Sequence, residues 1–175
     1  MTLNEQLFEA VSFAARAHRH ELRKDGKTPY SAHTFRVCLV VRQVFGIDDP
    51  KVLMTALLHD TIEDTPTDYD DVAKQFGPDV AGWVAALTKD MRLEETPREE
   101  DYQRALRQSD WPVTICKLAD LFDNLTDSRH LTVEQRARTI ARSTSYLESM
   151  RPTLKPQAEA AFAIVEQLIA KMRSA

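Results

Sequence analysis

Apolar residues recur at helical spacing, three or four positions apart, through nearly every segment of the chain. Alternating β-branched runs are few and only four glycines occur, so the pattern predicts an all-α fold. Cap residues divide the chain: Gly46 and Gly77 end helices, whereas Asp49 and Pro50 begin one. We expect a single bundle of about nine helices, at 4–22, 32–45, 50–64, 68–76, 79–88, 98–108, 112–127, 132–150 and 156–173.

Two further segments bear on the organisation of the chain. The connection 88–99, "TKDMRLEETPRE", is the most polar stretch between apolar segments, and we expect a solvated loop, with a lid over a site as the alternative. The C-terminal "AEAAFAIVEQLIAKM" is amphipathic without a basic face, which favours packing on the core or on a dimer partner over membrane anchoring. Residues 1–175 are therefore expected to form one domain, with a homodimer as an option.

Composition and charge limit the classes of function. The chain has 175 residues, 43% of them hydrophobic and 29% charged, as in an ordinary soluble domain. No apolar run approaches the roughly 20 residues that cross a membrane, and no secretory signal is apparent, so a cytoplasmic location is expected. A net charge of −4 argues against binding of nucleic-acid polymers. Any phosphate site is therefore local, and "RHELRKDGK", with Arg23 and Lys24, is the candidate.

The stretch "ALLHDTIEDT" at 56–65 places ionisable groups among core residues. On a continuous helix over 50–64, His59, Asp60, Glu63 and Asp64 lie within about 140° of one another and share a face. An unpaired buried carboxylate costs several kcal/mol, so partners are expected. A His-Asp pair alone is explained by a helix-capping Asp beside a satisfied core His, but it also suits a metal ion.

Two other segments add ligands to that pair. "TPYSAH" places His33 at the start of a helix, and "CKLADLFDN" places Asp120 in an apolar run. With His59 and Asp60 they form a two-His, two-Asp site for a divalent cation. Mixed nitrogen and oxygen ligands suit Mn²⁺, with Zn²⁺, Fe²⁺ and Co²⁺ as alternatives. Because such an ion lowers the pKa of a bound water, hydrolysis is the expected reaction.

Three polar side chains lie one helical turn beyond these presumed ligands. Glu63 and Asp64 follow His59 and Asp60 by one turn and could position a water or carry its proton. Alternatively, each carboxylate only orients a ligand through a hydrogen bond. Asn124 follows Asp120 by four residues and is expected to contact the substrate or the water.

Three ordered motifs, "RKDGKTPYSAH", "ALLHDTIEDT" and "KLADLFDN", resemble the HD-domain hydrolases over residues from about 8 to 150. More narrowly, they resemble the hydrolase domains of RelA/SpoT-type proteins and the stand-alone small alarmone hydrolases. The resemblance implies an all-α fold, Mn²⁺ as cofactor, and removal of pyrophosphate from the 3′ position of guanosine polyphosphates such as ppGpp, which leaves GDP or GTP. The implied partner is thus a small nucleotide substrate.

The resemblance also assigns roles to residues. It implies that the metal ligands are His33, His59, Asp60 and Asp120, and that the catalytic acids are Glu63 and Asp64. For the nucleotide it implies contacts with Arg23, Lys24, Asn124, Arg142 and Tyr146. An Arg–Tyr pair four residues apart is also common in plain surface packing, which is the alternative for the last two.

The chain departs from the family pattern in two places. "GKTPY" is one residue longer than the usual "GEPY", and Leu121 and Asp123 replace the usual residues after Asp120. Asp123 would repel an anionic substrate unless it pairs with a basic residue or faces away. The expected activity is (p)ppGpp hydrolysis. Three alternatives stay open: hydrolysis of another nucleotide, such as ppApp or a nucleoside monophosphate; a non-catalytic nucleotide sensor; and a helical bundle with incidental buried polar residues.

Overall fold

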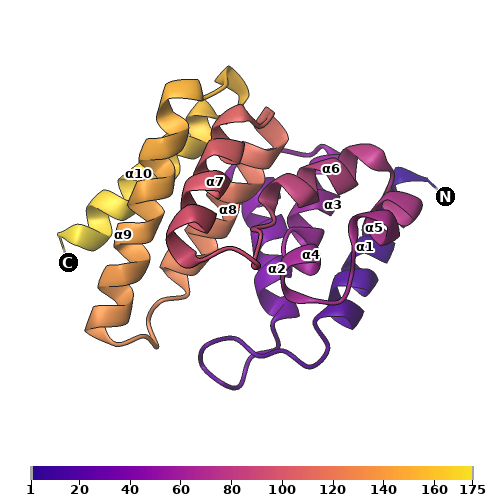
Figure 1. Ribbon diagram of the computed structural model, residues 1–175, viewed down its shortest axis with the longest axis horizontal. Coiled ribbons are helices and arrows are strands. Elements are labelled where there is room, and N and C mark those ends of the chain that lie inside the picture. Colours follow the sequence, from indigo (N-terminus) through magenta and orange to yellow (C-terminus); the bar gives the residue numbers. More distant parts are fainter. Residues whose placement is uncertain (1, 175) are drawn as a thin grey trace.

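The computed structural model describes residues 2–174, and every regular element among them is a helix (Figure 1). The predicted all-α fold is confirmed. The α-helices are α1 (Leu3–Ala17), α2 (Ser31–Leu39), α3 (Pro50–Leu58), α4 (Thr61–Asp64), α5 (Tyr69–Phe76), α6 (Pro78–Leu87), α7 (Glu95–Gln108), α8 (Trp111–Thr126), α9 (Val133–Met150) and α10 (Glu159–Arg173). A π-helix, Val40–Val44, continues α2, and short 3₁₀ helices at Arg151–Thr153 and Pro156–Ala158 connect α9 to α10.

Helices α3 and α8 form the centre of the molecule. Every residue from Val52 to Leu58 and from Pro112 to Leu121 is buried. Helix α8 packs against α2, α3, α9 and α10, while α3 also contacts α1, α2 and α6. Figure 1 shows α9 and α10 at one end of the molecule and α1 and α5 at the other. A charged side chain on α8 is therefore removed from bulk water and needs a protein or ligand partner.

The predicted helix over 50–64 is interrupted at His59 and Asp60. Helix α3 ends at Leu58, and the one-turn α4 begins at Thr61. The His59 ring Nδ1–H donates to the Ala56 carbonyl at 2.9 Å, and the Thr61 hydroxyl donates to the Leu58 carbonyl at 2.7 Å. Both side chains bind carbonyls three residues back, and the bend turns the His-Asp pair away from the regular helix. Counted as one, α3 and α4 correspond to one of the nine predicted helices.

The predicted helix over 4–22 was too long, because α1 ends at Ala17. Residues 18–30 form a loop. Asp25 accepts hydrogen bonds from the backbone N–H groups of Lys27 and Thr28, both at 2.9 Å, and Gly26 adopts a φ of 68° that favours glycine. The loop brings Arg23 and Lys24 to the surface of the cavity described below.

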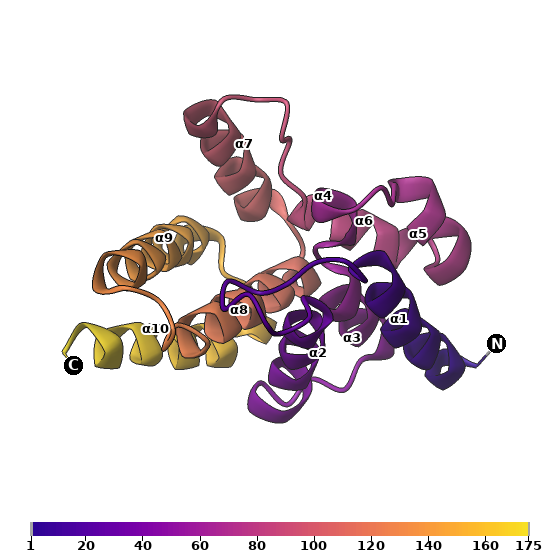
Figure 2. The same ribbon diagram turned by 90° about the horizontal axis from the view of Figure 1, so that it is seen from below.

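The polar connection between α6 and α7 is shorter than predicted. Helix α7 begins at Glu95 rather than at residue 98, so the connection covers 88–94. Its residues 90–92 are exposed, as expected of a solvated loop, but Lys89 lines the cavity. Figure 2 shows α4, α7, α8 and α9 arranged around one region, and side chains from all of them line that cavity.

The C-terminal helix α10 packs on the core, one of the two predicted locations. Phe162, Val165 and Ile169 are buried, and the helix contacts α8 and α9. None of the helices within residues 2–174 combines the length and the apolar character that spanning a bilayer requires.

Candidate active site

One cavity of about 250 Å³ contains all of the predicted site residues. Its walls come from the 18–30 loop, α2, the bend between α3 and α4, α4, the 88–94 connection, α7, α8 and α9, many of which lie far apart in the sequence. The predicted residues that line it are Arg23, Lys24, His33, His59, Asp60, Glu63, Asp64, Asp120, Asn124, Arg142 and Tyr146. The fold thus brings together side chains that three separate motifs contribute.

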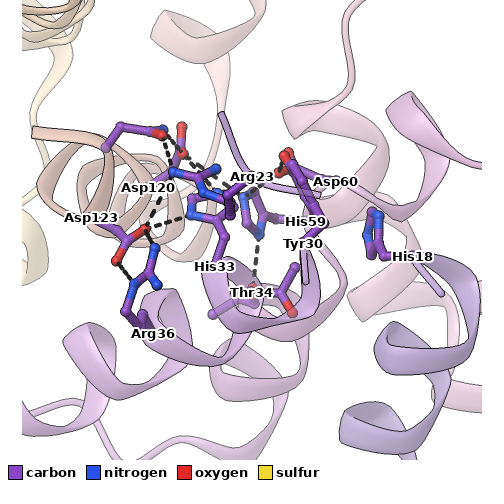
Figure 3. Close-up of polar contacts among 12 residues, drawn as sticks. His18, Arg23, Tyr30, His33, Thr34, Arg36, His59, Asp60, Asp120 and Asp123 are labelled. Carbon is purple, nitrogen blue, oxygen red and sulfur yellow. Dashed lines mark hydrogen bonds and ion pairs between the residues drawn. The ribbon is translucent and has the colours of Figure 1, made fainter. Parts of the chain in front are cut away.

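Two imidazoles and two carboxylates converge on one point of this cavity (Figure 3). Ligand atoms of His33, His59 and Asp60 lie within 4.8 Å of one another. Asp60 Oδ2 is 3.0 Å from His59 Nε2 and 3.5 Å from His33 Nε2. Asp120 Oδ1 approaches the same two nitrogens, at 3.9 and 3.4 Å. Three of the four predicted ligands therefore form one compact group, and the fourth, Asp120, adjoins its two imidazoles.

A hydrogen bond at Nδ1 orients each imidazole, so that its other nitrogen, Nε2, points toward the carboxylates of Asp60 and Asp120. His33 Nδ1 contacts Asp123 Oδ2 at 2.7 Å, and His59 Nδ1 contacts the Ala56 carbonyl at 2.9 Å. Because these acceptors bind a proton on Nδ1, each ring presents a lone pair at Nε2 once it is in its neutral form. Within residues 2–174, His59 Nε2 is buried and has no hydrogen-bond partner. A buried lone pair beside two carboxylates fits a divalent metal ion, which the cluster could hold.

The charges of the cluster also favour a cation. Burial disfavours the charged form of His33, but hydrogen bonds with Asp120, Asp123 and Asp60 outweigh it and raise the pKa of His33 to about 10. Burial likewise opposes ionisation of Asp60, yet the two imidazoles hold its pKa well below its usual value. The carboxylates thus supply a negative potential that attracts either protons or a metal ion.

The predicted catalytic acids lie beside this centre on α4. Glu63 Oε2 accepts a hydrogen bond from the backbone N–H of Lys89 at 2.7 Å. Burial, together with the charge of Asp60, raises the pKa of both Glu63 and Asp64 above the ordinary carboxyl value. A raised pKa suits groups that exchange protons near neutral pH. The hydroxyl of Tyr30 donates to Asp60 Oδ2 at 2.6 Å, which fixes the position of that carboxylate.

Basic side chains also line the cavity. Arg23 donates to Asn124 Oδ1 at 3.0 Å and to Asp127 Oδ2 at 3.2 Å, which fixes its guanidinium. Lys24 and Arg142 make no ion pair among residues 2–174, and burial and the nearby arginines lower the pKa of Lys24. Two neighbouring cations that form no ion pair within residues 2–174 make a site that attracts an anion.

Residues 10–147 match the family described as HD domain. The chain belongs to the HD-domain family. It is 41% identical over 123 residues to guanosine-3′,5′-bis(diphosphate) 3′-pyrophosphohydrolase MESH1 of Drosophila melanogaster, covering 70% of this chain and 69% of the relative. The Homo sapiens MESH1 is 41% identical over 130 residues, with coverages of 74% and 73%. A solved structure described as "A metazoan ortholog of SpoT hydrolyzes ppGpp and plays a role in starvation responses" superposes with a TM-score of 0.84, 31% identity and 95% coverage of both chains.

In this HD domain, Asp123 pairs with a basic residue, one of the two conditions under which the sequence analysis expected no repulsion of an anion. Arg36 donates to both of its oxygens, at 2.6 and 3.0 Å, and the carboxylate is almost fully buried (Figure 3). Asp123 is therefore neutralised and acts on His33 instead, a role that the sequence analysis missed. Arg36 lies one turn after His33, and Asp123 one turn after Asp120, so helical spacing was the signal available.

Tyr146 forms part of the cavity wall and does not extend freely into it. Its side chain is almost fully buried, and its hydroxyl donates to Glu99. Lys89 and Lys117 both lie against its ring, with Nζ 5.3 and 4.6 Å from the centroid. The sequence analysis did not single out Lys89, Glu99 or Lys117, because their common partner is a residue far along the chain.

Proposed function

We propose that this HD domain is a metal-dependent (p)ppGpp 3′-pyrophosphohydrolase, which converts its substrate to GDP or GTP and pyrophosphate. The observation that carries the proposal is one cavity that is lined by two histidines and two aspartates in contact, by Glu63 and Asp64, and by Lys24 and Arg142. The names of the relatives support the substrate, since they describe hydrolysis of this nucleotide. We further propose Mn²⁺, which suits mixed nitrogen and oxygen ligands.

Each group has a distinct task in this proposal. His33, His59, Asp60 and Asp120 would hold the ion, whose contribution when bound is to acidify a water and to offset charge on the phosphoryl oxygens. Glu63 and Asp64 orient the attacking water and exchange its proton, for which their raised pKa values are suitable. Both carboxylates line the cavity, so either can take up the proton of the water directly.

The nucleotide lies along the basic side chains of the cavity. Lys24 and Arg142 bind phosphate oxygens, since neither cation has a carboxylate partner within residues 2–174. Arg23 is already oriented by Asp127 and Asn124 and offers its remaining N–H groups. Tyr146 contributes to the cavity wall on this side, with its hydroxyl bound to Glu99.

We also propose that the chain forms one domain that acts in the cytoplasm. It binds neither membrane nor nucleic acid, and two copies could form a homodimer.

Hydrolysis of another nucleotide is the second candidate. The longer "GKTPY" loop and Leu121, which lines the cavity, are the features that favour it. The third feature, the charge of Asp123, no longer does, because Arg36 neutralises it. A non-catalytic sensor is disfavoured by the complete set of ligands and acids, which binding alone does not require.

A panel of nucleotides separates these functions. Purified protein with Mn²⁺ is incubated separately with ppGpp, ppApp and GMP, and products are resolved by ion-exchange chromatography. The proposal predicts rapid release of GDP and pyrophosphate from ppGpp. Faster turnover of ppApp or GMP would mean that the protein catalyses the same kind of hydrolysis on another substrate. Tight binding of ppGpp without turnover of any nucleotide would favour the sensor.

A further inference from the structure

A buried lysine, Lys117, contacts Asp120, one of the four predicted metal ligands. Lys117 is only 7% exposed, and its Nζ donates to Asp120 Oδ2 at 3.0 Å. It lies on α8 one turn before Asp120, between residues that are themselves buried. A buried ammonium group is costly unless a partner compensates it, so this position requires a carboxylate beside it.

The two oxygens of Asp120 have different partners. Oδ2 binds Lys117, whereas Oδ1 accepts from the Asn124 amide and faces the Nε2 atoms of His33 and His59 at 3.4 and 3.9 Å. Lys117 therefore holds one oxygen away from the cluster and directs the other toward it. A carboxylate that offers one oxygen occupies one coordination position of an ion, which leaves more positions for water and substrate.

Two tyrosines hold Lys117 in this place. Its Nζ lies 4.6 Å from the ring centroid of Tyr146 and 5.2 Å from that of Tyr102. The rings meet edge to face, at 5.7 Å and 88°, and form a rigid wall. Lys89 lies against the same rings, at 5.3 and 5.1 Å, but its Nζ binds Glu99 and not Asp120. The fold thus contains two lysines in similar aromatic surroundings, only one of which contacts the cluster.

We propose that Lys117 is a positioning residue for the metal site, which fixes Asp120 so that Oδ1 alone faces the ion, while Tyr102 and Tyr146 fix Lys117. This inference rests on the proposed metal-dependent function. In this inference Lys117 does not bind the ion itself and affects it only through Asp120. The consequence is a structural link between the ring of Tyr146, on the nucleotide side of the cavity, and a metal ligand.

Lys117→Met tests the proposal, because it removes the charge and keeps the length and most of the packing. The matched control is Lys89→Met, which removes the other lysine from the same pair of rings. Mn²⁺ affinity is measured by isothermal titration calorimetry, and folding by circular dichroism and thermal unfolding. We expect Lys117→Met to weaken Mn²⁺ binding about 10-fold or more, as loss of a hydrogen-bond partner of a ligand does. Lys89→Met should stay within about twofold of the unmodified protein, since it touches no ligand.

A second comparison tests whether Lys117 acts through Asp120, and it applies even if Lys117→Met fails to fold. Asp120→Asn is compared with the double variant Asp120→Asn/Lys117→Met, in which His33, His59 and Asp60 still bind the ion. We expect both to have the same Mn²⁺ affinity.

Three results would overturn the inference: unchanged or tighter Mn²⁺ binding in Lys117→Met, an equal loss in Lys89→Met, or a further loss in the double variant. If the unmodified protein hydrolyses ppGpp with Mn²⁺ in such a case, the proposed function stands and only the role of Lys117 fails. An unmodified protein without affinity for Mn²⁺ would reject both.

Discussion

The Nδ1–H of His33 donates to Asp123 Oδ2 at 2.7 Å. Arg36, which is partly exposed, binds the same buried carboxylate through two nitrogens, so a charge-neutralised Asp123 contacts the imidazole. The arrangement fixes the tautomer in which Nε2 faces Asp60 and Asp120. Asp123, which seemed unfavourable for an anionic substrate, thus orients the side chain of a predicted ligand.

Removal of this carboxylate is expected to weaken the metal site. In Asp123→Ala, His33 loses the acceptor that orients it, and we expect Mn²⁺ affinity to fall about 10- to 100-fold. Asp127→Ala is the control, because Asp127 also binds Arg36, at 2.8 Å, but makes no hydrogen bond to His33. Equal Mn²⁺ affinities of the two variants in calorimetry would argue against the orienting role.

Glu63 is expected to act on the proton and not on the metal. Glu63→Gln keeps the size of the side chain and removes its basicity, so we expect kcat to fall about 10²-fold or more, with unchanged Mn²⁺ affinity. The exposed Glu100→Gln on α7 serves as the control. Full activity of Glu63→Gln in steady-state assays would exclude the catalytic role.

Metal binding is expected to release protons. The carboxylates around His33 raise its pKa to about 10, so the imidazole carries a proton at neutral pH that must leave when an ion binds. Affinity should therefore rise as the pH rises toward that value, about tenfold per pH unit for each proton released. Calorimetry in buffers of different ionisation enthalpy measures the number of protons. An affinity independent of pH between about 6 and 8 would contradict the charge distribution described here.

Arg142 is expected to bind substrate without contributing to the metal site. Arg142→Met removes a cation that has no ion pair within residues 2–174, and we expect KM for ppGpp to rise about 10-fold, with kcat changed about threefold at most. Arg138→Met, one turn earlier on α9 and exposed, is the control. A fall in kcat at constant KM would assign Arg142 to the chemical step instead.

Most helices could be predicted from the sequence, because periodicity and caps are local signals. The three motifs predicted part of the cavity lining, but not Tyr30, Lys89, Tyr102 or Lys117. The bend at His59 could not be predicted, since it depends on which carbonyl the ring binds in the folded protein. Nor could the contacts of Lys117 with Tyr102 and Tyr146, which join α7, α8 and α9. Contacts between distant segments produce no periodic pattern in the sequence from which they could be predicted.

The central claim is tested most directly by incubating the purified protein and its His59→Ala variant with Mn²⁺ and ppGpp, and by quantifying GDP, pyrophosphate and orthophosphate over time. The account predicts equal amounts of GDP and intact pyrophosphate from the unmodified protein, and neither product from the variant. Release of orthophosphate, absence of hydrolysis, or equal turnover by His59→Ala would contradict it.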